Sequence, residues 1–97
     1  MPINEQIASR TAELFATLCD PTRVRILSAL LEHSELNVSA LAKRLGMSES
    51  AISHQLRSLR QTRVVRARKE GRQVFYKIDD EHVAMLLQQG LEHAMHD

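Results

Sequence analysis

Four potential metal ligands lie near the C-terminus of this 97-residue chain: Asp80, His82, His93 and His96. The surrounding sequence predicts one helix over about residues 80–95. His82 and His93 are eleven positions apart, which is about 16 Å along an α-helix that rises 1.5 Å per residue. A zinc ion needs its ligands within about 2.3 Å. One copy of this helix therefore cannot place both histidines on one ion.

A second copy of the same helix removes this difficulty. The positions of the outer pair, Asp80 and His96, have nearly the same sum as those of the inner pair, His82 and His93. Two identical antiparallel helices that cross near residue 88 would produce this relation. Two-fold symmetry would then create two equivalent sites. We therefore predict a homodimer whose metal sites are shared between the subunits.

Local features favour this ligand set over the alternative, a polar helix face exposed to solvent. His93 and His96 have the i, i+3 spacing of one helix face. Asp80 can cap the helix, which lets it stand beside His82. Residues 78–97 contain five acidic residues and no Lys or Arg. We expect this negative field to attract a cation.

The same helix also carries an apolar stripe, which we expect at the dimer interface together with the first helix of the chain. Gly90 lies near the expected crossing and would let the two backbones approach each other. The stripe consists of Val83, Leu86, Leu87, Leu91 and Ala94.

Three imidazoles and one carboxylate suit a borderline divalent ion in tetrahedral geometry. The predicted cofactor is therefore Zn2+, with Co2+ as a close mimic and Ni2+ less favoured. Four protein ligands leave no open position for a water molecule, which disfavours a hydrolytic zinc enzyme. The sequence shows neither a nucleophile–base pair nor a glycine-rich phosphate loop. We predict that the protein is not an enzyme and has no small-molecule substrate.

The net charge of +1 hides a strong segregation of charge. Residues 43–77 carry ten basic and two acidic side chains, whereas the remainder carries three basic and ten acidic ones. A basic middle between acidic ends is typical of a nucleic-acid-binding surface. This pattern disfavours another possibility, a dimerisation module held together by zinc that never contacts DNA.

Length and composition indicate one small globular domain that spans residues 1–97. Hydrophobic residues make up 43% and charged residues 26% of the chain, which is the balance of a folded protein rather than a disordered one. Neither a membrane-spanning apolar run nor a signal-peptide pattern is present. The single cysteine, Cys19, excludes an intrachain disulfide and suits the cytoplasm. We expect it to be a small core residue.

Hydrophobic periodicity and helix-breaking residues predict a mainly α fold with a small β-hairpin. Residues 33–37 are predicted to be a polar connection. Helices are expected at residues 5–18, 21–32, 38–45, 49–60 and about 80–95, and hairpin strands at 64–68 and 73–78.

The third and fourth of these helices fit a helix-turn-helix. Gly46 can take the positive φ that ends the first helix of the pair, and Leu41, Leu45, Ile52 and Leu56 would bury the motif. A structural αα-hairpin is the alternative, but the basic hairpin that follows favours DNA binding. The expected DNA contacts are Ser48, Ser50, Ser53, His54, Gln55 and Arg57 near the start of the recognition helix, and Arg68, Lys69 and Arg72 in the hairpin, which would act as a wing.

Three segments, Asp20–Arg23, Ser50–Leu56 and Arg68–Tyr76, resemble the ArsR/SmtB family of metal-responsive winged-helix repressors. The four ligands look like those of its CzrA-like zinc- and cobalt-sensing branch. The resemblance implies a winged helix-turn-helix homodimer that binds double-stranded operator DNA and is released by metal. Members that sense arsenic, cadmium or lead carry cysteines where this chain has Asn37 and Ser39. The remaining alternative is a DNA-binding repressor of the same fold whose dimer helix carries no sensor, or which responds to another signal.

Overall fold

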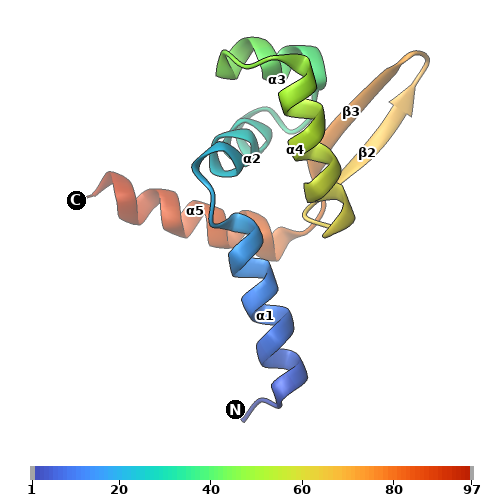
Figure 1. The fold of residues 1–97 in the computed structure, drawn as a ribbon. Helices are drawn as coiled ribbons and strands as arrows, with labels where there is room; N and C mark the ends of the chain where they lie inside the picture. The colour runs from blue at the N-terminus through green and yellow to red at the C-terminus, as the bar shows by residue number, and fades with distance from the viewer. Residues whose placement is uncertain (1, 97) are drawn as a thin grey trace.

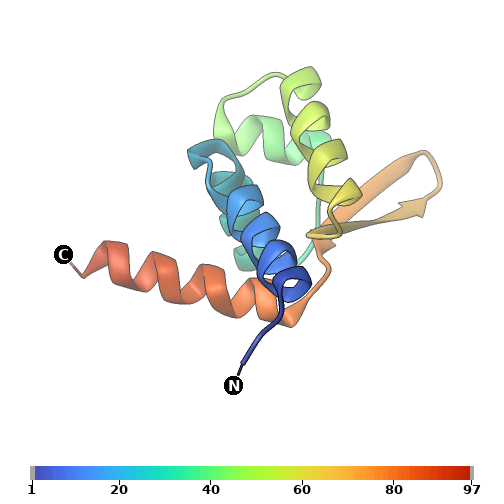
Figure 2. The ribbon, with the colours of Figure 1, turned by 60° about the horizontal axis from the view of Figure 1, so that its bottom comes forward.

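The computed structural model describes residues 2–96 and contains five helices and three strands in that range. The hairpin and the C-terminal end of the last helix extend in opposite directions (Figures 1 and 2). No helix within these residues is long and apolar enough to span a membrane. The elements are α1 (Glu5–Leu18), α2 (Pro21–His33), β1 (Leu36–Asn37), α3 (Val38–Leu45), α4 (Glu49–Gln61), β2 (Val65–Glu70), β3 (Gln73–Ile78) and α5 (Glu81–Met95).

Each of these five helices begins after a residue whose side-chain oxygen accepts a hydrogen bond from a backbone N–H of the first turn. Such a cap satisfies one of the N–H groups that have no partner within the helix, and contributes about 1 kcal/mol to stability. Pro21 can follow its cap directly because the first helical position does not need an N–H. The caps are Asn4, Asp20, Asn37, Ser48 and Asp80.

The predicted helix-turn-helix is formed by α3 and α4. Gly46 ends α3 in the left-handed conformation, with φ of 66°, as predicted. The four apolar residues expected to bury the motif, Leu41, Leu45, Ile52 and Leu56, are at most 9% exposed. They join Ile26, Leu27 and Leu30 of α2 and Val83 and Leu87 of α5 in one hydrophobic cluster. A fully buried side chain of this type contributes about 1.5–3 kcal/mol, so this cluster fixes α4 relative to α2.

The hairpin belongs to a small antiparallel sheet with strand order β1-β3-β2. Strand β1 pairs Leu36 with Tyr76 of β3. The prediction of a connection over residues 33–37 was therefore wrong at its last two residues, because a two-residue strand is too short to show a pattern. It was also wrong at His33, which is the last residue of α2. The strand expected at 64–68 is β2, which extends to Glu70, so the turn lies at Gly71 and Arg72. Gly71 accommodates the turn with φ of 60°.

Helix α1 is attached to the rest of the chain mainly near its C-terminal end. Thr17 is its one buried residue, and Leu14 and Leu18 pack against the core cluster. Ile7, nearer the start of the helix, and Phe15 are 45% and 53% exposed.

Cys19, which follows α1, is also exposed. The expectation that it is a core residue was therefore wrong. The contacts of α1 with the core end at Leu18, one residue earlier.

Candidate metal centre and nucleic-acid interface

Two of the four predicted metal ligands meet at the start of α5. Asp80 Oδ1 accepts a hydrogen bond from the backbone N–H of His82 at 2.7 Å and lies 2.9 Å from His82 Nδ1. The backbone N–H of His82 is the main cause that lowers the pKa of Asp80 below its ordinary value. The carboxylate is therefore an anion at neutral pH. The His82 side chain is 88% exposed, so the pair presents a carboxylate and an imidazole at the surface.

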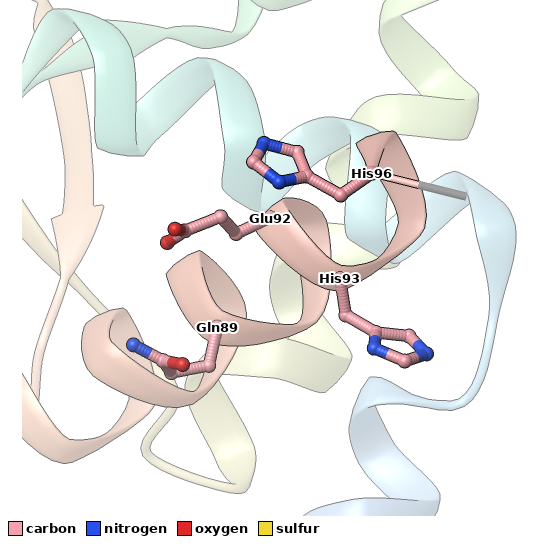
Figure 3. Close-up of a pocket in the computed structure, with 4 residues that line it drawn as sticks. All are labelled: Gln89, Glu92, His93 and His96. Carbon is pink, nitrogen blue, oxygen red and sulfur yellow. The ribbon is translucent and has the colours of Figure 1, made fainter.

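The other two ligands, His93 and His96, lie at the opposite end of α5. Together with Gln89 and Glu92 they line a shallow hollow (Figure 3). In Figure 3 the ring of His93 points to one side of the helix, while His96 points to the other side together with Glu92. His96 is the C-cap residue, where the backbone leaves the helical conformation. The i, i+3 spacing therefore does not by itself align the two rings.

The two pairs do not come together within one chain. Within residues 2–96, no three His, Cys, Asp or Glu side chains lie close enough to hold one metal ion. The reason is the regular rise of α5, which separates His82 from His93 by about 16 Å. Each end of the helix thus supplies only two of the four predicted ligands.

The apolar stripe predicted on α5 is divided between two faces. Val83 and Leu87 are 3% and 7% exposed and belong to the core of their own chain, and Leu91 packs against that core. The prediction that these three residues form the dimer interface is not supported by their burial. Leu86 and Ala94 are exposed. Apolar spacing on α5 showed that a stripe exists but not which side the chain's own core covers.

In the N-terminal half of α4, where DNA contacts are predicted, the side chains differ in exposure. Ser50, His54 and Arg57 are exposed, while Ser53 and Gln55 are half-buried. Ser48, also a predicted DNA contact, caps the helix, because its Oγ accepts a hydrogen bond from Ala51 N at 3.0 Å.

Arg23, which sequence reasoning did not single out as a functional residue, makes hydrogen bonds with two side chains of α4. Arg23 of α2 donates from Nε to Gln55 Oε1 at 3.0 Å. Arg23 also donates from Nη2 to Ser58 Oγ at 2.8 Å. Arg23 lies 32 positions from Gln55 in the sequence, so no local sequence pattern signals this contact.

The three basic residues predicted in the wing are in different situations. Arg68 is held by a bidentate ion pair with Glu35, from Nη2 to Oε1 at 2.9 Å and from Nε to Oε2 at 3.0 Å. Its Nη1 lies 3.2 Å from Glu70 Oε2, and its Cζ lies 5.1 Å from the centre of the Phe75 ring. Lys69 and Arg72 are exposed near the tip. The positive charge of Arg68 is thus largely compensated within the protein.

Glu35 is the partner that sequence reasoning did not find. It lies in the connection before β1, 33 positions from Arg68. The hydrogen bonds from Arg68 are the main cause that lowers the pKa of Glu35 below its ordinary value. This ion pair joins the wing to the segment that leads into the helix-turn-helix.

Comparison with known proteins places this fold among bacterial regulators. A family model described as bacterial regulatory protein, arsR family, matches residues 20–67, from the cap of α2 into β2. The chain is 46% identical over 86 residues to a transcriptional repressor SmtB homolog from Synechocystis. The matched region covers 89% of this chain and 64% of that protein. The chain is 39% identical over 95 residues to the HTH-type transcriptional regulator NmtR of Mycobacterium tuberculosis, covering 98% of this chain and 78% of that one.

Solved structures give the same result. The AntR antimony-specific transcriptional repressor superposes with a TM-score of 0.89 at 35% identity, over 100% of this chain and 90% of that one. The homodimeric winged helix-turn-helix DNA-binding domain of Mb0332 from Mycobacterium bovis superposes with a TM-score of 0.82 at 29% identity, over 97% and 89% of the two chains. These likenesses extend over nearly the whole chain, including α1 and α5.

The Glu35–Arg68 pair predicts a measurable titration. We expect the Glu35 side chain to titrate below the ordinary glutamate value of 4.5, as followed by 13C NMR of its carboxyl carbon. Because the folded-state pKa is depressed, the stabilisation from this pair is present above pH 4.5 and is lost as pH falls through the folded-state value. Arg68→Gln should return the pKa of Glu35 towards 4.5.

Lys69→Gln is the matched control for this measurement, since Lys69 is a neighbouring basic residue that makes no hydrogen bond with Glu35 in the described structure. It should leave the Glu35 titration close to that of the wild type. Equal effects of the two substitutions would contradict a specific ion pair and indicate only the general positive field of the wing.

Proposed function

Because the chain belongs to the arsR family of bacterial regulatory proteins, we propose that it is a metal-responsive transcriptional repressor. The observation that carries this proposal is that the two predicted ligand pairs lie at the two ends of one helix, α5. Asp80 and His82 are adjacent at the start of α5, and His93 and His96 line a hollow at its end. The relatives described above are regulators rather than enzymes, and we propose the same for residues 1–97.

We propose that each metal site takes Asp80 and His82 from one subunit and His93 and His96 from the other. The donor set fits zinc, and cobalt as its close mimic, because imidazole and carboxylate suit a borderline ion with four ligands. The ionised Asp80 supplies negative charge, and the exposed rings of His93 and His96 can reorient at low cost, since exposed side chains change rotamer within nanoseconds. A bound ion would supply a fixed link between two helix ends and no reaction chemistry.

The proposed homodimer is supported by apolar surface that the chain does not cover itself. Ile7 and Phe15 of α1 and Met85 and Leu86 of α5 are 37–62% exposed. An apolar surface of this kind is typical of a protein–protein contact. The homodimeric state of the Mycobacterium bovis relative supports the same arrangement here.

We propose that the dimer binds double-stranded operator DNA in the cytoplasm, with one recognition helix α4 in each of two successive major grooves. The proposed groove contacts are the exposed Arg57, His54 and Ser50 and the half-buried Ser53. In the wing, Lys69 and Arg72 supply uncompensated charge for the DNA backbone, and Arg68 contributes more to wing orientation than to phosphate binding.

Release from DNA follows from the position of Asp80. Asp80 follows the last strand of the wing, β3, after a single intervening residue, Asp79. Ligation of Asp80 by an ion shared with the other subunit would therefore restrain the wing and the dimer interface together. We propose that this restraint favours a quaternary arrangement in which the two recognition helices no longer match the operator.

Zinc should lower the affinity of the dimer for a duplex taken from the region upstream of its own gene. We expect a decrease of about 5- to 150-fold, the usual range of allosteric coupling, and an equal decrease in zinc affinity when DNA is bound. Fluorescence anisotropy with and without zinc measures the first effect, and a zinc-chelator competition measures the second. His82→Ala should bind the duplex like the wild type and lose the zinc response. Unchanged wild-type affinity in the presence of bound zinc would mean that the metal site is structural.

A mixed dimer tests whether the sites are shared. A His82→Ala chain and a His96→Ala chain, carrying different tags, should form a heterodimer that binds one zinc ion tightly, because both lesions fall in the same shared site. Each mutant homodimer should lack tight sites, and the wild-type dimer should have two. A heterodimer without any tight site would show that each site is built within a single chain.

Gly90→Ala tests the predicted crossing of the two α5 helices. In the isolated chain a Cβ at Gly90 has no neighbour within 4 Å, and alanine is favoured over glycine in a helix, so the fold should be retained. If the helices cross at Gly90, the added methyl group should weaken dimerisation by about 1–3 kcal/mol, the usual cost of overpacking. Gln88→Ala serves as the control in analytical ultracentrifugation, because Gln88 is exposed and lies about 160° around the helix from Gly90. A dimer of wild-type affinity would place the crossing elsewhere.

A further inference from the structure

The guanidinium group of Arg23 joins three helices. It lies near the start of α2, where its own backbone N–H donates to the cap residue Asp20. Its side chain donates from Nη1 to the carbonyl oxygen of Thr17 in α1 at 3.2 Å, from Nε to Gln55 Oε1 at 3.0 Å, and from Nη2 to Ser58 Oγ at 2.8 Å. All three nitrogens of the planar fork are therefore used at once.

The contact with α1 has a clear physical cause. The last carbonyl groups of a helix have no partner within it, and the residue four positions after Thr17 is Pro21, which has no N–H to offer. Arg23 provides the missing donor. A permanent positive charge at this C-terminal end is also favourable for the helix dipole. This explains why an arginine stands two residues after the proline.

The contact with α4 determines how Gln55 faces the DNA side of the molecule. Because Gln55 Oε1 already accepts a hydrogen bond from Arg23 Nε, its two amide N–H groups are left to act as donors. Donors of this kind suit acceptor groups such as guanine N7 and O6 or a phosphate oxygen. Gln55 is half-buried, so its amide is held at the edge of the surface rather than moving freely.

We propose that Arg23 is a positioning residue that fixes the amide of Gln55 for DNA contact and holds it in a set place relative to the end of α1. This inference rests on the proposed DNA-binding function and adds a specific determinant of operator selectivity to it. Arg23 acts through Gln55 and need not contact the DNA. Since α1 otherwise touches the core mainly through Leu14 and Leu18, the same fork also connects the proposed dimer surface to the recognition helix.

The test is a double-mutant cycle between Arg23→Lys and Gln55→Ala. Lysine keeps the charge but lacks the planar fork that serves three acceptors. Affinity is measured for a duplex from the region upstream of the gene and for a scrambled duplex of equal composition. Arg23→Lys should lower the ratio of the two affinities about tenfold, within the discrimination expected from one polar base contact. In the Gln55→Ala background the same substitution should change the ratio less than twofold, because coupled residues are non-additive.

Arg25→Lys is the matched control, since Arg25 is also on α2 but its side chain donates to the carbonyl oxygen of Leu45 and, within residues 2–96, makes no hydrogen bond with α4; it should keep the wild-type ratio. A second measurement does not depend on DNA: Arg23→Lys should shift the NMR signals of the Gln55 side-chain amide, and Arg25→Lys should not. Unmoved Gln55 signals, or an equal loss for both duplexes, would overturn the positioning role while leaving the DNA-binding function intact. A wild type that does not distinguish the two duplexes would instead overturn the proposed function itself.

Discussion

A straight α-helix keeps side chains eleven positions apart at a distance of about 16 Å, and this rigidity governs what α5 can do. Its N-terminal cap brings Asp80 and His82 together, and its last turns carry His93 and His96. No local adjustment within one chain can unite the two pairs on a single ion. The helix therefore has half of the predicted site at each end, and a second chain is the natural source of the other half.

One side of α5 packs against the core of its own chain, so only the remaining surface of the helix is available to a second chain. Val83 and Leu87 face inward and complete the core around α2. This fixes the rotation of α5 and leaves Met85 and Leu86 on the outside. With α1 attached mainly near its C-terminal end, the exposed apolar surface lies on the two helices that bound the chain. The arrangement separates residues that stabilise the fold from residues available to a partner.

On the proposed DNA-binding side, charge alone does not define function. Ten basic residues lie in the middle segment of the chain, residues 43–77, yet their side chains have different roles. Arg68 is bound to Glu35 and Glu70 and orients the wing, whereas Lys69 at the tip is exposed. Arg23, which lies outside this segment, holds Gln55 of the recognition helix. Some basic residues thus orient the wing or Gln55, whereas others supply the positive charge proposed to attract DNA.

Much of the fold was predictable from the sequence because its signals are local. Caps such as Asp20 and Ser48 and the left-handed Gly46 mark the helix ends within a few residues, so the starts of α2 and α4 and the end of α3 were predicted correctly. The two-residue strand β1 was missed because its pairing with β3 leaves no periodic pattern. The spacing of the ligands on α5 was also readable, since it depends only on the rise of a helix.

The sequence by itself determined the helices, the hairpin, the charge segregation and the separation of the two ligand pairs. Only the tertiary structure decided which apolar residues of α5 the core would cover, and that Arg68 pairs with Glu35 and Arg23 with Gln55. The physical reason is that these contacts join residues 32 or 33 positions apart. Such contacts arise from the packing of whole elements, which local sequence patterns do not specify.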